Sequence, residues 1–313
     1  MFFRKIRFLL TAAAVFMLAD PIHAAPGAQP DRSAAGQKVS YAISSPTVVA
    51  AASEGLRAQG PGGKDNVLIF SAPPRETPED GAKIYQPVTE YLSGVIGKRI
   101  VYVHPNNWLT YQTDMQKGSY DLVFDGPHFN SWRIANIQHN ALAKIAEEFV
   151  FAVIVRKDDP LTDIKQLAGK KICGMNPPNL GTLAVLGQFD NPSRQPVLID
   201  TVGWARVYGG VVADKRCAAG ILPITNLKKY DSGNFSRVIY KTKVLPNQAF
   251  SAGPRIPPEE QAKIAAALVS PEASAAVAKL LEAYGNDKGL TRAAKDEYAG
   301  VDAYLKDIWG YAR

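Results

Sequence analysis

The chain has few of the residues on which metal centres and nucleophilic catalysis depend. Its 313 residues include two cysteines and four histidines, and the histidines are dispersed. Neither Cys173 nor Cys217 has a second Cys or a His at the spacing of metal ligands. No Ser occupies a nucleophile elbow, and neither Cys has neighbours that would activate a thiolate. We therefore expect no metal site, no cofactor and no catalytic site.

Clusters of positive charge and long apolar segments are also missing from most of the chain. Lys and Arg number 36 against 29 Asp and Glu, but the excess is spread thinly and part of it lies at Arg4, Lys5 and Arg7. No basic run is interleaved with aromatic residues, so nucleic-acid binding has no support. Beyond the N-terminus, no segment is both long and apolar enough to span a bilayer.

The N-terminus has the pattern of a secretory signal peptide. Its three basic residues precede an uncharged apolar run, Phe8–Leu18, and small residues follow at Ala24 and Ala25. The run is shorter than the ~20 residues that cross a membrane. We therefore expect a signal peptide of residues 1–24, cleaved after Ala24, rather than an uncleaved anchor. No Cys lies near that position, so we expect no lipid attachment, and the expected compartment is a bacterial periplasm.

Residues 25–65 are rich in Ala, Gly, Ser, Pro and Gln and show no sustained periodicity. We interpret them as a mobile leader outside the folded core. The remaining chain is about the size at which one hydrophobic core tends to divide into two.

From Asn66 onward, strand and helix patterns alternate, which predicts an α/β fold with parallel sheets. Ile84, Val88 and Leu92 have helical spacing, and Gly97 ends that helix. In open α/β sheets ligands bind beyond the carboxyl ends of strands, so we expect a site in the loops that follow them, including Asp125–Phe129. The strands expected in this part of the chain are 67–71, 100–103 and 122–124.

The pattern repeats after Pro160, which predicts a second lobe. Its expected strands are 171–174, 196–200, 217–222 and 238–242, and its helices start near Thr182 and Trp204. Two segments are expected to cross between the lobes, Arg156–Pro160 and Leu245–Ala249. The predicted division is residues 66–155 plus 249–313 for the first lobe and residues 156–248 for the second.

The two cysteines fall on predicted neighbouring strands of the second lobe. In an oxidising compartment an isolated pair more often forms a disulfide than stays free, and we favour a Cys173–Cys217 bridge. The alternative is two buried thiols that act as small hydrophobic residues.

The second lobe also contains a marked helix start. Pro177 and Pro178 lack backbone donors, and Asn179 is placed to cap a helix that runs through Thr182. The free N–H groups of a helix start bind anions. The alternative is an ordinary capped helix with no ligand.

Several short motifs follow one another in order along the chain: Phe70-Ser71-Ala72-Pro73, Tyr91-Leu92 before Gly97-Lys98, Gly118–Leu122, Gly126-Pro127, and Leu167–Ile172 followed by a loop and Gly181. In this order and spacing they resemble the substrate-binding components of ABC transporters, in the phosphate, phosphite and phosphonate receptor group. The resemblance covers nearly all of residues 66–313. It implies a two-lobed type II periplasmic-binding fold, a ligand in the cleft and a membrane permease as partner.

The chain departs from this family at two places. Phosphonate receptors usually have a Ser-Thr-Ser-Gly hydroxyl cluster at the second-lobe helix start, where this chain has Pro178, Asn179, Leu180 and Gly181. Backbone amides still suit an anion there, but we expect weak or no binding of simple phosphonates. Where the family often has a small polar stretch with a His, this chain has 203–206, Gly-Trp-Ala-Arg.

Each candidate binding residue has a structural alternative. Asp125 and His128 either bind an amine or hydroxyl of the ligand, or serve as a helix cap and a satisfied loop histidine. Trp204 is either a stacking wall or a core residue. Arg206 either pairs with a carboxylate or phosphate, or is solvated. The predicted ligand-binding set is Asp125, His128, Phe129, Asn179, Gly181, Thr182, Trp204, Arg206, Asn247 and Gln248.

These observations predict a monomeric periplasmic receptor that delivers a small polar, anionic ligand to an ABC permease, the ligand being phosphate-like, phosphonate-like or another oxyanion. The alternative is a periplasmic sensor that presents its ligand-bound form to a membrane signalling protein. The same fold and cleft serve both functions.

Overall fold

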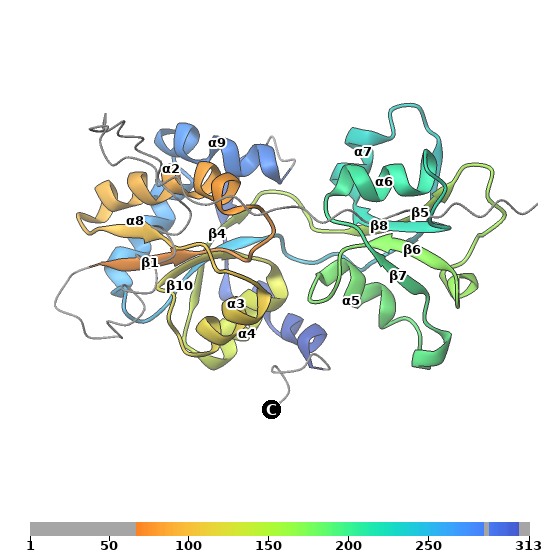
Figure 1. Cartoon of the computed structure of the whole chain (residues 1–313). Coiled ribbons are helices and arrows are strands. Elements are labelled where there is room, and N and C mark those ends of the chain that lie inside the picture. The colour runs from red at the N-terminus through yellow and green to blue at the C-terminus, as the bar shows by residue number, and fades with distance from the viewer. Residues whose placement is uncertain (1–66, 285–287, 307–313) are drawn as a thin grey trace, which may run out of the picture. The chain divides into compact units, whose positions relative to one another are not determined.

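The computed structural model describes residues 67–284 and 288–306 of the protein (Figure 1). The predicted signal peptide, residues 1–24, and the predicted leader, residues 25–65, lie outside the described residues.

The first lobe is built on a six-stranded sheet with the strand order β11-β4-β10-β3-β1-β2. Strands β2, β1 and β3 are parallel, with Phe70 opposite both Tyr102 and Leu122, whereas β10 and β11 pair antiparallel with their neighbours. The strands are β1 (Leu68–Ser71), β2 (Ile100–Tyr102), β3 (Leu122–Asp125), β4 (Asn140–Ile145), β10 (Ala249–Ala252) and β11 (Leu290–Arg292).

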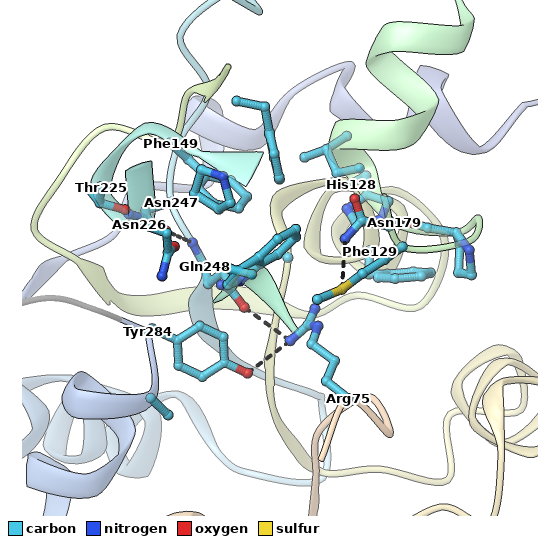
Figure 2. A pocket seen from close by; sticks show the side chains of 18 of the residues that line it. Arg75, His128, Phe129, Phe149, Asn179, Thr225, Asn226, Asn247, Gln248 and Tyr284 are labelled. Carbon is cyan, nitrogen blue, oxygen red and sulfur yellow. Dashed lines mark hydrogen bonds between the residues drawn. The ribbon is translucent and has the colours of Figure 1, made fainter. Parts of the chain in front are cut away.

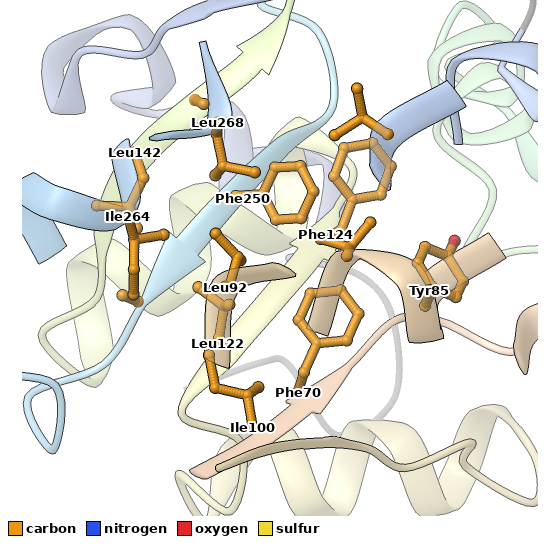
Figure 3. Close-up of a cluster of buried hydrophobic side chains, with 14 of the residues drawn as sticks. Phe70, Tyr85, Leu92, Ile100, Leu122, Phe124, Leu142, Phe250, Ile264 and Leu268 are labelled. Carbon is orange, nitrogen blue, oxygen red and sulfur yellow. The ribbon is translucent and has the colours of Figure 1, made fainter. Parts of the chain in front are cut away.

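Helices cover both faces of this sheet because alternate residues of its strands point to opposite sides. Phe70 packs with Leu92 and Phe250 in a core that α2, α8 and α9 cover (Figure 3). Ile69 points the other way, into a core with α3 and α4. The helices are α2 (Pro78–Ile96), α3 (Trp108–Gln116), α4 (Pro127–Asn136), α8 (Pro258–Leu268) and α9 (Ser274–Ala283).

The second lobe is built on a five-stranded sheet with the order β7-β6-β8-β5-β9. Val153 packs in the core on the α5 side, while Ala152 and Ile154 pack on the side of α6 and α7. Figure 1 shows α6 and α7 on one face of this sheet and α5 on the other. The elements are β5 (Phe151–Arg156), β6 (Lys171–Gly174), α5 (Leu180–Leu186), β7 (Val197–Asp200), α6 (Trp204–Val212), β8 (Ala219–Pro223), α7 (Ile224–Tyr230) and β9 (Ser236–Lys241).

Both sheets are mixed rather than mostly parallel, which corrects one part of the predicted fold class. In the second sheet β6 is parallel to β7 and β8, but β5 is antiparallel to β8 and β9. The two-lobed arrangement with helices on both sides of each sheet is as predicted.

The first predicted crossing, Arg156–Pro160, is wrong. Strand β5 pairs within the second sheet, so the chain leaves the first sheet after β4 and before Phe151. The second crossing lies between β9 and β10, at the predicted Leu245–Ala249 segment. Phe149 and Leu245 exchange backbone hydrogen bonds of 3.0 and 3.1 Å, so the two crossing segments pair with each other.

Several elements were not predicted. The expected loop Asp125–Phe129 is in fact the end of β3 and the first turn of α4. Strands β4, β10 and β11 and helix α7 were also missed. Short 3-10 helices complete the described chain: η1 (Ile164–Leu167), η2 (Pro192–Arg194), η3 (Pro271–Ala273), η4 (Lys295–Tyr298) and η5 (Val301–Leu305).

The predicted disulfide is confirmed. Cys173 of β6 and Cys217, just before β8, are bonded with their α-carbons 5.6 Å apart. A bridge that closes a loop of this length stabilises a fold by about 2–4 kcal/mol, mainly by restricting the unfolded chain.

Within the described residues, no single helix is long and apolar enough to cross a membrane; the bent pair 258–268 and 271–283, with 74° between its halves, passes such a test only when joined.

Candidate functional site

A pocket of about 480 Å³ is lined by residues of both lobes and of the two crossing segments (Figure 2). Its volume is in the usual range for small-molecule sites. The polar and charged side chains that line it are Arg75, Glu76, His128, Glu147, Glu148, Asn176, Asn179, Asp200, Thr225, Asn226, Asn247, Gln248 and Tyr284.

Arg75 is the only Lys or Arg among the described residues that line this pocket. It lies in the loop between β1 and α2, at the carboxyl end of a parallel strand, and its side chain is 21% exposed. Its Nη1 donates to Gln248 Oε1 at 3.0 Å and to the Tyr284 hydroxyl at 3.1 Å (Figure 2), and its Nη2 donates to Asp125 Oδ1 at 3.1 Å. Three partners therefore hold the guanidinium in one orientation.

The groups around Arg75 keep its guanidinium protonated and therefore positively charged. Burial on its own lowers the pKa of the guanidinium, but Tyr284, Asp125, Tyr85 and Glu76 together outweigh that effect, and the pKa lies above its usual value. Arg75 is therefore a fixed cation at the pocket wall.

Asp125 lies behind Arg75 and is completely buried. Its Oδ2 accepts from Arg133 Nη2 at 2.7 Å and also from the Tyr111 hydroxyl, while its Oδ1 accepts from the Gly126 amide at 2.6 Å. Both of its oxygens are therefore engaged by protein donors, one of them Arg75 Nη2, and Asp125 is absent from the pocket lining. Its predicted contact with a ligand stays a prediction.

Glu76 and Tyr284 continue this network toward the pocket. The Tyr284 hydroxyl donates to Glu76 Oε1 at 3.3 Å and lies 3.0 Å from the Tyr85 hydroxyl. Burial raises the pKa of Glu76, although Arg75 opposes the shift. Burial likewise raises the pKa of Tyr284, to about 12. Glu76 Oε2 is buried without a hydrogen-bond partner in the described structure.

His128, on the first turn of α4, lines the pocket and is only 3% exposed. Its Nε2 lies 3.0 Å from the carbonyl oxygen of Pro178, in the loop before α5, and its Nδ1 has no hydrogen-bond partner in the described part of the chain. Burial lowers the pKa of His128 to about 4. The adjacent Phe129 also lines the pocket and stacks on Trp108, with ring centroids 6.2 Å apart.

The predicted helix start is present at α5, but only part of it reaches the pocket. The Asn179 side chain accepts from the Thr182 amide at 3.2 Å, which is the predicted cap, and Asn179 lines the pocket. Thr182 is buried and donates its hydroxyl to the Met175 carbonyl at 2.6 Å. Gly181 packs on Phe151. Neither Gly181 nor Thr182 belongs to the lining.

Of the two predicted ligand-binding residues at the start of α6, Trp204 lies in the pocket lining and Arg206 does not. Gly203 has φ 97°, a conformation that favours glycine, and turns the chain so that α6 starts at Trp204. Trp204 is partly buried, lines the pocket and lies edge-on to Phe151 with centroids 6.1 Å apart. Arg206 is exposed and outside the lining, so the structure does not bring it into the site.

Asn247 and Gln248, from the second crossing, both line the pocket and are 6% and 7% exposed. Asn247 Nδ2 donates to the Glu147 carbonyl of the first crossing at 2.9 Å. The Tyr298 hydroxyl donates to the Asn247 carbonyl at the same distance. Asn247 therefore joins the crossing segments, whereas Gln248 orients Arg75.

The sequence prediction missed Arg75, the one Lys or Arg among the described residues of the pocket lining. Arg75, Glu76, Tyr284 and Asn226 were not selected, although the loop that contains Arg75 was one of the loops expected to line a ligand site. The sequence signal that could have identified Arg75 was the position of this loop, which directly follows the carboxyl end of a strand. Tyr284 had no such signal, because it comes from the end of α9 and only the three-dimensional fold brings it to Arg75.

The fold and the pocket define a solute receptor of the type II periplasmic-binding class. Residues 70–298 match the family described as the phosphonate periplasmic substrate-binding proteins of ABC transporters. The chain therefore belongs to this family, whose members are periplasmic and bind small-molecule ligands for an ABC permease.

Solved structures show the same fold at low sequence identity. XAC2383 from Xanthomonas citri, bound to ATP, is 13% identical with a TM-score of 0.61 and matches over 78% of this chain and 100% of that one. PhnD1 from Prochlorococcus marinus, in complex with methylphosphonate, is 15% identical with a TM-score of 0.59 over 77% of this chain and 97% of that one. A binding component of an ABC phosphonate transporter from Pseudomonas aeruginosa is 13% identical with a TM-score of 0.56, over 75% and 84%. A search of curated proteins found no significant match.

Proposed function

We propose that the protein binds a small organic oxyanion in this pocket and presents it to the permease of an ABC transporter. The observation that carries the proposal is Arg75, a charged guanidinium that is held in place by Asp125 and Gln248 at the pocket wall. A guanidinium with a fixed orientation suits the oxygens of phosphate, phosphonate or carboxylate groups. The two structural relatives named above with phosphorus-containing ligands, methylphosphonate and ATP, support the same ligand class.

The rest of the pocket favours a ligand with an organic part. A cavity of about 480 Å³ is larger than a single tetrahedral oxyanion needs, and the aromatic rings of Trp108, Phe149 and Trp204 line it. Such rings provide large apolar contact surfaces. We therefore expect oxyanions that carry an aromatic or apolar group to bind more tightly than inorganic phosphate or methylphosphonate.

A thermal-shift screen of phosphate, phosphite, phosphonates, sulfonates, carboxylates and nucleotides tests the proposal. A ligand that binds only the folded protein raises its melting temperature by mass action. Arg75→Gln removes the cation of the site and is expected to weaken binding by about 10-fold to 100-fold, because a hydrogen bond to a charged group contributes about 1.5–3 kcal/mol.

Arg206→Gln is the matched control, since Arg206 is exposed and lies outside the pocket lining. The control should bind as the unaltered protein does. If no oxyanion shifts the melting temperature, or if Arg75→Gln binds as tightly as Arg206→Gln, the proposed function is wrong.

Several finer features belong to the same proposal. We propose that the signal peptide is cleaved after Ala24, that the protein acts in the periplasm, and that it is a monomer. The residues that contact ligand are proposed to include Arg75, His128, Asn179 and Trp204. N-terminal sequencing of the exported protein and light scattering at working concentration check the first and third of these statements.

A further inference from the structure

The positive charge of the described chain is concentrated in the second lobe. Residues 151–245, which contain the second sheet and its helices, include 14 Lys or Arg, seven Asp and no Glu. In the sequence these cations are scattered. The strand topology decides which of them lie together in the folded lobe.

One end of the second sheet reaches the pocket, and the other end points away from it. Met175, Asp200 and Pro223, at the carboxyl ends of β6, β7 and β8, line the pocket. The strands of this sheet are four to six residues long, so their opposite ends lie roughly 13–20 Å from the pocket end. We call this opposite end the outer edge; it consists of residues 156–159, 170–171, 194–197, 214–219 and 235–236.

Strand pairing and backbone hydrogen bonds bring these five segments side by side. Val197 of β7 is paired with Lys171 of β6, and the Lys171 carbonyl accepts from the Ala218 amide at 2.8 Å. The Lys157 amide, directly after β5, donates to the Phe235 carbonyl at 2.8 Å. Five neighbouring strand ends at the usual spacing of ~4.8 Å extend over roughly 19 Å.

The outer edge has seven Lys or Arg side chains and three carboxylates. Arg156 contacts Asp158 at 3.5 Å and Asp159 at 3.0 Å, and Arg216 lies 3.9 Å from Asp214. These pairs use all three carboxylates. The other five cations are exposed and have no carboxylate within 4.0 Å among the described residues: Lys157, Lys170, Lys171, Arg194 and Lys215.

The two ends of the outer edge have exposed apolar side chains. Val197, the first residue of β7, is 50% exposed, and Phe235, directly before β9, is 62% exposed. Strands β7 and β9 are the outermost strands of the sheet, so these two residues flank the unpaired cations. Cations interspersed with exposed apolar residues suit a membrane surface, where the cations meet anionic head groups and apolar side chains enter the boundary of the acyl chains.

The extended form of this edge also favours a flat partner. A compact anion can contact only neighbouring cations, whereas an anionic plane can contact all five unpaired ones at once. We propose that the outer edge binds the surface of a membrane that contains anionic phospholipids and holds the receptor there, with the pocket end of the second sheet turned away from the lipid. This inference goes beyond the proposed function and does not depend on which solute the pocket binds.

Sedimentation of the exported protein with lipid vesicles tests the inference. Vesicles of equal parts phosphatidylcholine and phosphatidylglycerol should bind the protein, and vesicles of phosphatidylcholine alone should bind it much more weakly. Binding to the mixed vesicles should fall when the salt concentration rises from about 0.05 M to about 0.5 M, because salt screens interactions between exposed charges.

The double variant Lys170→Gln with Lys171→Gln removes two unpaired cations. It should weaken binding to the mixed vesicles by about 10-fold to 30-fold, the effect of two cations at an anionic surface. Phe235→Ser should weaken it by about 3-fold to 10-fold through the lost insertion of the ring.

The matched control is Lys241→Gln with Lys243→Gln, which removes the same charge from the same lobe. Both lysines are exposed, and Lys241 is the last residue of β9, at the pocket end of the sheet. The control should bind the mixed vesicles as the unaltered protein does. All of these variants should keep the original melting temperature, because the replaced side chains are exposed.

The proposal is overturned if both kinds of vesicle bind equally, if salt has no effect, or if the control pair weakens binding as much as the Lys170 and Lys171 pair. It is also overturned if neither kind of vesicle binds. Retention on immobilised polyglutamate that is lost in the Lys170 and Lys171 variant would then assign the outer edge to an acidic protein surface. The thermal-shift screen tests the oxyanion pocket separately, so the two proposals can fail independently.

Discussion

Asp125 was predicted from the sequence as a ligand contact, but its protein partners in the folded chain were not predicted. Its place after a buried strand marked it as a ligand contact, yet the folded chain surrounds it with Arg75, Arg133 and Tyr111. Arg133 is itself only 1% exposed. The sequence could not reveal these partners, because they come from three different elements and their meeting depends on the packing of α3 and α4 against the sheet.

The charge of Asp125 should be essential for stability as well as for the orientation of Arg75. Asp125→Asn removes the carboxylate charge that both Arg75 and the buried guanidinium of Arg133 contact, and it should lower the free energy of unfolding by about 3–5 kcal/mol. Urea denaturation monitored by circular dichroism measures this change.

Asp158→Asn is the control for this prediction, because the Asp158 side chain is 80% exposed in its contact with Arg156. Surface ion pairs contribute about 0–1 kcal/mol. Equal stabilities of the two variants would contradict the structural role assigned to Asp125.

At the scale of elements, the sequence predicted best where local patterns and long-range packing agree. Helix α2 begins at a Thr77 cap, whose side chain accepts from the Asp80 amide at 3.2 Å, and ends at Gly97 with φ 65°. Its apolar spacing was sufficient to predict it. Strands β4 and β10 were missed, and residues 151–155, which form most of β5, were placed in the first lobe, because strand pairing between distant segments leaves little trace in local composition.

Helix α5 packs so closely on β5 that its Gly181 tolerates no side chain. An ideal Cβ would lie 2.3 Å from Phe151 Cδ1, so Gly181→Ala forces the ring or the helix to move. We expect a loss of about 1–3 kcal/mol, the usual cost of overpacking a core. Because Phe151 also lines the pocket, ligand affinity should fall as well.

Gly209→Ala in α6 is the matched substitution, since nothing lies within 4 Å of its ideal Cβ. Ala is favoured over Gly inside a helix by roughly 0.5–1 kcal/mol. The two variants should therefore shift the melting temperature in opposite directions. A melting temperature for Gly181→Ala at or above that of the unaltered protein would show that α5 is not packed as described.

At the scale of the whole described chain, the lobes are joined by more than the two crossing segments. The C-terminal helix η5 contributes Val301 to the second-lobe core and Leu305 to the core beneath α3 and α4. Asp302, between them, accepts from the Ser131 hydroxyl of α4 at 2.9 Å. Family resemblance predicted two lobes, but it did not predict this third connection, whose short 3-10 helix has no clear periodicity.

If η5 couples the two cores, its main anchor should influence their cooperativity as well as their stability. Leu305 is 1% exposed, and Leu305→Ala should cost about 2–5 kcal/mol through lost apolar contacts and the cavity left behind. Differential scanning calorimetry should show one unfolding transition for the unaltered protein and two, or one markedly broadened, for Leu305→Ala. Val197→Ala, at a residue that is 50% exposed, should keep a single transition near the original temperature. A single sharp transition in Leu305→Ala, merely moved to lower temperature, would mean that η5 stabilises the first lobe without linking it to the second. Asn247 and the paired crossing segments would then carry the coupling between the lobes alone.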